Sequence, residues 1–322
     1  MGDDRAAALA AGRWPLLQSL YLGSNGFTAA AAAALAADWR WHSLRVLLLP
    51  FCNLSDQGVA ALATAMSALT SLESLSLAQA GGGTSAATAL AAATWPRLTE
   101  LLLSRNSFDA SSAAALATGK WPVLSKLHIC VNDIGALGAQ HLAAAHWPNL
   151  QKLDVHSCGL GDAGAAAIAG AAFPQMRKLG IGVNNIGPVG AAALAGANWR
   201  FLERMDLSEN ELGDEGAARL AAGQWRLLLR LHIDHNSLTA EGVAAALEGS
   251  EWPCLEQLSL EGNGPEGNGL EAAEVEPLVA SRDLGRPPPY VKIVTLVLLL
   301  LTTSSDEDWL IENSHFSEGV AP

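Results

Sequence analysis

The stretch WPVLSKLHICVNDIGALGAQHLAAAH, residues 121–146, has two halves with different periodicities. In the first half, apolar side chains follow the spacing L-x-x-L-x-L-x-x-N, whose central part alternates as in a strand with one buried face. The second half is rich in alanine, the best helix former, and ends just before another tryptophan. The stretch therefore predicts a short strand, a turn at Asn132 and a helix.

The same pattern recurs along the chain at intervals of 26 to 28 residues. Including the copy at Trp121, the clear copies begin at Trp14, Trp95, Trp121, Trp147, Trp199, Trp225 and Trp252, and weaker ones begin at Trp41, Leu69 and Phe173. A fixed period in this range is typical of a solenoid, in which each unit buries its apolar face against its neighbours. We predict an α/β solenoid over residues 1–263, with about ten units plus a partial first unit, parallel strands on the concave side and helices on the convex side.

Most of the repeated residues have a structural role in this prediction. The tryptophans should stack as a buried seam; an aromatic ligand groove is the alternative, but Phe173 and Leu69 preserve only bulk at two positions. The asparagines should form a ladder along the turns, with Cys52 and Cys158 taking two places in it. Ala80 departs from this pattern and precedes three glycines, so we expect a looser turn there.

On these motifs, and on alanine-rich helical halves such as GAAAIA at 164–169, the chain resembles leucine-rich-repeat proteins. It is most similar to the ribonuclease-inhibitor-like class and its GALA-type repeats. The resemblance implies a parallel-stranded horseshoe that binds proteins on its concave face. GALA-type members often carry an F-box that recruits a ubiquitin ligase, but no such segment precedes residue 14.

Composition excludes several other functions. The net charge is −13, and seven of these negative charges fall in residues 264–322, so the solenoid lacks the basic surface that nucleic acid requires. No apolar run approaches the length of about 20 residues that spans a bilayer, and no membrane binding is expected. The four cysteines do not form a disulfide framework, which favours reduced thiols in the cytoplasm.

The strand positions between the leucines are free to carry function. The residues before the second leucine are basic in five consecutive units: Lys126, Lys152, Lys178, Arg204 and Arg230. The positions that follow hold His128, Asp154, His156, Asp206, His232 and Asp234, whereas units two to four hold the more apolar Val46, Leu48, Phe51 and Leu102. We predict that these eleven polar residues bind a protein or peptide partner. The alternative is that the basic side chains pair with neighbouring aspartates and only keep the surface soluble.

Catalysis, metal binding and cofactor binding are not expected from these residues. Histidine and aspartate suit zinc, and His128 should lie beside Asp154, but His232 is four strands from His128, or on the order of 19 Å. A shallow open sheet should also give little desolvation for acid–base work.

The two ends of the chain depart from the repeat. Residues 2–14 align with residues 213–225, so the chain opens in mid-repeat, either as a fragment or with an exposed first strand. Residues 264–301 are predicted to cap the solenoid, with Tyr290, Ile293, Leu296 and Leu298 in the spacing of an eleventh strand; a membrane-associating tail or an error in the gene model are alternatives. Residues 302–322 are predicted to be a disordered tail.

The sequence thus predicts a non-enzymatic scaffold that binds a protein or peptide, in an oligomeric state that it does not define. Three alternatives stay open. The first is a GTPase-activating regulator resembling the Ran GTPase-activating protein. The second is a fragment of a ubiquitin-ligase substrate receptor, and the third is the sensing end of an immune-type receptor.

Overall fold

The computed structural model describes residues 2–12, 14–37, 41–67 and 69–264. The predicted capping segment and tail, residues 265–322, lie outside the described residues. Within the described part, helices and strands alternate strictly from α1 to β10. Residues 3–10 form a helix that packs against the next helix, which agrees with the assignment of the first residues to the second half of a unit.

Each strand has three residues and each helix has 8 to 11. The strands are β1 (Ser19–Tyr21), β2 (Val46–Leu48), β3 (Ser74–Ser76), β4 (Glu100–Leu102), β5 (Lys126–His128), β6 (Lys152–Asp154), β7 (Lys178–Gly180), β8 (Arg204–Asp206), β9 (Arg230–His232) and β10 (Gln257–Ser259). The helices are α1 (Asp3–Ala10), α2 (Ala29–Ala37), α3 (Ser55–Ala65), α4 (Thr84–Ala92), α5 (Ala110–Ala117), α6 (Gly135–Ala143), α7 (Gly161–Ala169), α8 (Pro188–Ala195), α9 (Gly213–Leu220) and α10 (Ala240–Gly249).

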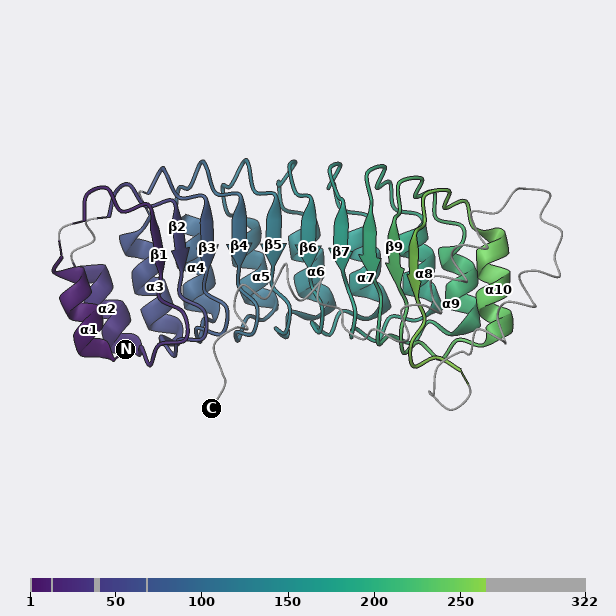
Figure 1. Ribbon diagram of the computed structural model, residues 1–322, viewed down its shortest axis with the longest axis horizontal. Coiled ribbons are helices and arrows are strands. Elements are labelled where there is room, and N and C mark those ends of the chain that lie inside the picture. The colour runs from purple at the N-terminus through teal and green to yellow at the C-terminus, as the bar shows by residue number, and fades with distance from the viewer. Residues whose placement is uncertain (1, 13, 38–40, 68, 265–322) are drawn as a thin grey trace.

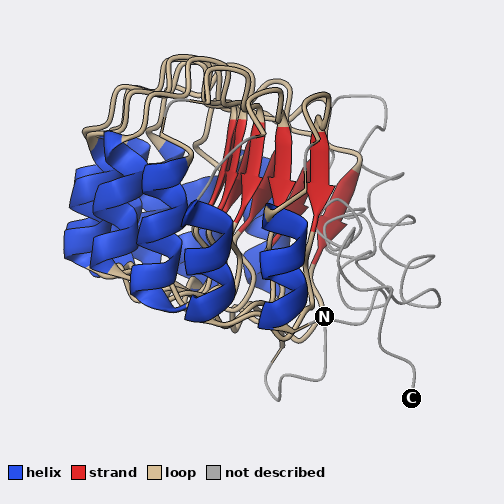
Figure 2. Ribbon diagram, turned by 90° about the vertical axis from the view of Figure 1, so that its left-hand side faces the viewer, coloured by secondary structure: helices blue, strands red, loops and turns tan. Residues whose placement is uncertain are grey.

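All ten strands form one parallel sheet in sequence order, without a crossover. Figure 1 shows the strands side by side in one row, and Figure 2 shows the helices as a second layer on one side of that row. Unit n is named here after its strand βn. The central residue of each strand is buried against the helices, while the first and third residues lie on the other side, called the sheet face.

The predicted tryptophan seam is confirmed in the middle of the chain. Trp95, Trp121, Trp147 and Phe173 stack in series, with ring centroids 6.1–6.5 Å apart and interplanar angles of 13–17°. All four rings are buried, so they are core packing rather than a ligand groove. The prediction is wrong for Trp14, whose side chain is 51% exposed. Trp14 follows α1, and among the described residues no ring of a preceding unit stacks on it.

The asparagine ladder is also confirmed. The side-chain oxygen of Asn132 accepts hydrogen bonds from the backbone N–H groups of Asn106 (3.1 Å) and Phe108 (3.0 Å), in the preceding unit. Its amide nitrogen donates to the carbonyl of Ile129 at 2.8 Å. Cys158 takes the same place and donates from its thiol to the Ile129 carbonyl at 3.4 Å. Each ladder residue therefore satisfies buried backbone groups of two units.

The expectation of a looser turn at Ala80 is wrong. The backbone N–H groups of Ala80 and Gly82 donate to the side-chain oxygen of Asn106 at 3.1 and 2.9 Å, as in the other units. Gln79 adopts φ 50°, close to the value at the same position in neighbouring turns. The turn is closed by the asparagine of the next unit, so alanine at its own ladder position leaves the shape unchanged.

The residue before each ladder position lies in the left-handed region of φ in every one of the ten units. We call this row the ridge; it consists of Ser24, Phe51, Gln79, Arg105, Val131, Ser157, Val183, Glu209, His235 and Gly262, with φ between 50° and 64°. Only Gly262 is a glycine, the residue that adopts this conformation without steric cost. The ridge follows the carboxyl ends of the strands and borders the sheet face.

Aspartates in the first turn of one helix cap the helix that follows. The carboxylate of Asp56 in α3 accepts hydrogen bonds from Gly83 N (2.7 Å) and Ala86 N (2.8 Å) at the start of α4. Asp162 and Asp214 hold the starts of α8 and α10 in the same way. Burial raises the pKa of Asp56, but the hydrogen bonds outweigh this effect and leave the pKa below its usual value.

Candidate functional site

The two predicted rows of functional side chains are confirmed as rows by the strand register. Lys126, Lys152, Lys178, Arg204 and Arg230 are register partners on consecutive strands, and we call them the basic column. Glu100 on β4 and Gln257 on β10 stand at its two ends. The third strand residues, namely His128, Asp154, Gly180, Asp206 and His232, form a parallel second column. The predicted neighbours are therefore neighbours in the fold.

The members of the basic column are not equally accessible. Lys126, Lys152, Arg204 and Arg230 are partly exposed on the sheet face. Lys178 is only 8% exposed, so the prediction that it lies open to a partner is wrong. The accessible members of the column are therefore the other four cations.

Asp154 shows that parts of the sheet face are more deeply buried than expected. Its side chain is 5% exposed; one oxygen accepts a hydrogen bond from the backbone N–H of His156 at 3.1 Å, and the other lies 3.9 Å from Nδ1 of His128. Burial raises the pKa of Asp154. The expectation that an open sheet gives little desolvation is therefore wrong at this position.

Asp234 forms a second buried carboxylate cluster, in unit nine. It accepts hydrogen bonds from the hydroxyl of Ser208 (3.2 Å), and also from groups of the next unit, Ser259 and Glu261. Nδ1 of His232 lies 3.9 Å from Oδ2 of Asp234, the oxygen that also accepts from Ser208. Burial raises the pKa of Asp234, as it does for Asp154. The predicted proximity of His128 and Asp154 is confirmed, and His232 and Asp234 form a second such pair in a separate cluster.

Neither cluster has the composition of a metal site. Among the described residues, no group of three or more histidines, cysteines, aspartates or glutamates is arranged to hold a metal ion. The ring of His156 instead packs on Gly182, two residues after β7, where an added Cβ atom would be 2.7 Å from its Nδ1. Burial raises the pKa of the Cys130 thiol, which makes it a poor nucleophile near neutral pH.

The amino-terminal end of the sheet face is apolar, and one of its members is missing from the predicted set. Tyr21 on β1 is 66% exposed and is in register with Leu48, which is partly exposed. Phe51 on the ridge is 40% exposed. The alternation in LYL at 20–22 places Tyr21 on this face, so a signal for it is present in the sequence. The sheet face thus changes from a mixture of apolar residues, serines and Glu100 in units one to four to a mainly charged surface in units five to nine.

A family model described as Leucine Rich repeat matches residues 146–169 and 200–221. These stretches contain β6 with α7 and β8 with α9, two complete strand-and-helix pairs of the ten-stranded array. The fold is a leucine-rich-repeat solenoid. Among solved structures, an internalin (inlF) from Listeria monocytogenes str. 4b F2365 matches with 21% identity and a TM-score of 0.48, covering 77% of this chain and 68% of that one. The comparison with curated proteins gives no match.

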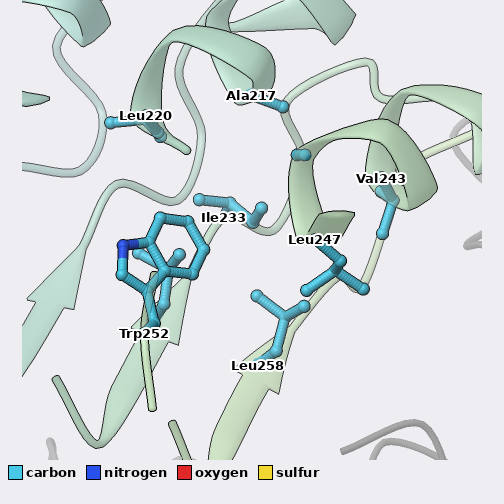
Figure 3. A pocket seen from close by; sticks show the side chains of 9 residues that line it. Ala217, Leu220, Ile233, Val243, Leu247, Trp252 and Leu258 are labelled. Carbon is cyan, nitrogen blue, oxygen red and sulfur yellow. The ribbon is translucent and has the colours of Figure 1, made fainter. Parts of the chain in front are cut away.

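The leucine-rich repeats also enclose an apolar cavity, between α9, α10, β9 and β10 (Figure 3). Its lining consists of apolar side chains alone, among them Leu231, Ile233, Leu247 and Trp252. A ligand site normally adds a few convergent polar groups to such a lining. This cavity is therefore a packing gap between the last two repeats. No helix in the described parts of residues 2–264 is long and apolar enough to cross a membrane.

We expect Asp154→Asn to raise the free energy of unfolding at pH 7 by on the order of 1 kcal/mol, because it removes a buried charge. The pKa of Asp154 is higher in the folded state than in the unfolded state, so its protonated form favours folding at a pH below the unfolded-state pKa. This contribution to stability is lost as the pH rises through the folded-state pKa. The gain from asparagine should therefore shrink as pH falls toward about 4. Chemical denaturation between about pH 4 and pH 8 measures it.

The matched control for this experiment is Asp56→Asn, because the pKa of Asp56 is lowered rather than raised. Its stabilising contribution is present above the unfolded pKa and is lost as pH falls through the folded pKa. Asp56→Asn should thus destabilise the fold at pH 7 and lose this effect in acid. A loss of stability for Asp154→Asn at pH 7 would contradict the assignment of Asp154 as a costly buried charge.

Proposed function

We propose that this protein is a non-enzymatic interaction scaffold that binds a protein or peptide on the sheet face of units four to nine. The observation that carries the proposal is the basic column: five cations stand in register on adjacent strands, about 4.8 Å apart. Like charges directly opposite one another destabilise a sheet. The repeat does not require them, since units one to four carry Ser19, Val46, Ser74 and Glu100 at the same position.

The contacts of the second column favour binding over mere solubility. One oxygen of Asp154 accepts from the backbone of His156, and one oxygen of Asp206 accepts from the backbone of Ser208 at 2.9 Å. Each of these carboxylates thus accepts a hydrogen bond from the backbone that follows its own strand. Solubility alone would also not need five cations on one face, because the described helices and loops offer many other exposed positions.

Two finer assignments belong to the same proposal. We place the chain in the ribonuclease-inhibitor-like class, since each of units one to nine begins with a strand and returns through a full helix after the turn. We place the protein in the cytoplasm, since the buried thiols of Cys52 and Cys158 donate to backbone carbonyls in the asparagine ladder and are needed in reduced form.

The test is charge reversal on the sheet face. Lys152→Glu combined with Arg204→Glu should weaken the affinity for a partner, first identified by affinity purification and then purified, by at least about tenfold. Lys178 is left unchanged because it is nearly buried and its reversal would disturb folding. The matched control is Lys120→Glu with Arg226→Glu, which makes the same change of charge at exposed loop positions.

Isothermal titration calorimetry measures both affinities, and circular dichroism checks that both variants are folded. Equal loss of affinity in the sheet-face and loop variants would mean that net charge, not this face, determines binding. Unchanged affinity in the sheet-face variant would place the partner elsewhere on the solenoid.

A further inference from the structure

The ridge and the basic column run along the solenoid in parallel, on either side of the second column. The backbone N–H of Val131 donates to the carbonyl of His156 at 2.8 Å, and that of Val183 donates to the carbonyl of Ser208 at 2.9 Å. These bonds extend the sheet ladder past the strands, so ridge residues repeat at the strand spacing, about 4.8 Å. The charged half of the sheet face is thus a strip with cations along one edge and ridge residues along the other.

Two ridge residues conflict with their own backbone conformation. Val131 and Val183 adopt φ values of 55° and 52°, in the left-handed region. This region is a genuine outlier for a β-branched residue, whereas asparagine and glycine accept it. Val131 is 37% exposed and Val183 is partly exposed, so burial does not compensate for the strain. Residues whose backbone conformation conflicts with the preference of their side chain occur mainly at functional positions.

The spacing along the strip selects the shape of a partner. One turn of an α-helix rises about 5.4 Å, close to the strand spacing of about 4.8 Å. An extended peptide places alternate side chains about 6.8 Å apart and loses register with the cations after two units. Val131 and Val183 are two units apart, about 10 Å, and two helical turns cover about 11 Å. One helix therefore matches both edges.

The width of the strip is also that of a helix. Val131 lies five positions after Lys126, and the chain turns after β5, so the strip is at most about 16 Å wide. A helix with its side chains is about 10–12 Å wide, and the long lysine and arginine side chains bridge the remainder. The carboxylates of Asp154 and Asp234 are buried, whereas Asp206 is partly exposed and Glu209 is exposed. The four accessible cations therefore outnumber the two accessible carboxylates of the strip.

We propose that the sheet face of units five to nine binds an acidic α-helix of a partner protein, with carboxylates on its first, second, fourth and fifth turns over Lys126, Lys152, Arg204 and Arg230 and two apolar side chains, seven residues apart, on Val131 and Val183. This proposal rests on the proposed function and adds the chemistry of the partner. Charge complementarity fixes orientation and speeds association, while the apolar contacts favour one register of the helix.

The probe is a synthetic alanine-based helix of about 20 residues, with glutamate at i, i+4, i+11 and i+14 and leucine at i+1 and i+8. A peptide of the same composition in scrambled order, without these faces, is the control. Fluorescence anisotropy with the full chain should show at least about tenfold tighter binding of the patterned peptide. Its affinity should fall as salt screens the charges.

Two variants assign the contacts. Lys152→Glu with Arg204→Glu should weaken binding of the patterned peptide at least about tenfold, while Lys120→Glu with Arg226→Glu should change it much less. Val131→Asn with Val183→Asn should weaken binding about fivefold and yet raise the melting temperature, because asparagine relieves the left-handed strain. A merely structural role of the valines would not produce opposite changes in stability and affinity.

Equal binding of the patterned and scrambled peptides would overturn the proposal, and so would asparagine variants that bind as well as the wild type. If the patterned peptide does not bind but sheet-face charge reversal still weakens a purified natural partner, the helix inference fails and the scaffold function stands. If the loop variants lose as much affinity as the sheet-face variants, both the helix inference and the proposed binding on the sheet face fail.

Discussion

Asn184→Ala is expected to lower the free energy of unfolding by about 3–5 kcal/mol, because several buried backbone groups lose their partner at once. The Asn184 side chain is fully buried in the turn of unit seven. Its nitrogen donates to the carbonyls of Val155 (2.9 Å), Ile181 (3.0 Å) and Gly182 (2.8 Å). Its oxygen accepts from the backbone of the preceding unit, at Cys158 (3.0 Å). Alanine can make none of these bonds.

The control is Asn184→Cys, since cysteine already fills the ladder at positions 52 and 158. A thiol can donate to a carbonyl, as Cys158 does to Ile129, but it accepts hydrogen bonds weakly. We therefore expect Asn184→Cys to lose roughly half as much stability as the alanine variant. Denaturant unfolding gives both values, and hydrogen exchange shows whether protection is lost first in units six to eight. If Asn184→Ala lowers the free energy of unfolding by less than about 1 kcal/mol, water must replace the hydrogen bonds that the asparagine side chain makes.

The fold could be predicted from the sequence because its main signals are periodic. Each leucine, asparagine and tryptophan position is repeated several times, so a single weak copy such as Leu69 can be placed by its neighbours. The same repetition predicts the strand register, and with it the alignment of the basic column on adjacent strands. Because each pattern recurs at a fixed interval, many weak local signals together predict the fold clearly.

The site was predicted less completely, because exposure depends on contacts that the repeat does not encode. The sequence places Lys178 and Lys152 in equivalent positions, yet Lys178 is nearly buried and Lys152 is partly exposed. The burial of Asp154 and the left-handed backbone of Val131 follow from packing and turn geometry rather than from spacing. At Ala80 the sequence predicted a looser turn that the structure does not have. The turn keeps its shape because Asn106 of the next unit accepts a hydrogen bond from its backbone.

Trp121→Ala is expected to lower the free energy of unfolding by about 3–5 kcal/mol, the usual cost of removing a large buried aromatic side chain. Its ring is 1% exposed and stacks on Trp95 at 6.5 Å and on Trp147 at 6.1 Å. The loss therefore falls on two interfaces between units. In a solenoid each unit is stabilised mainly by its neighbours, so a gap in the middle of the array also weakens the coupling between the two halves.

Trp121→Phe separates the bulk of the ring from its polar group. Among the described residues, the buried Nε1 of Trp121 has no hydrogen-bond partner, and Phe173 fills the same place in unit seven at 6.5 Å from Trp147. We expect this variant to lose less than about 1.5 kcal/mol. Trp95→Phe should lose about 1 kcal/mol more, because Nε1 of Trp95 donates to the carbonyl of Met66 at 2.9 Å. Equal losses at the two positions would mean that stacking area alone sets the stability of the seam, since only Trp95 has that hydrogen bond to lose.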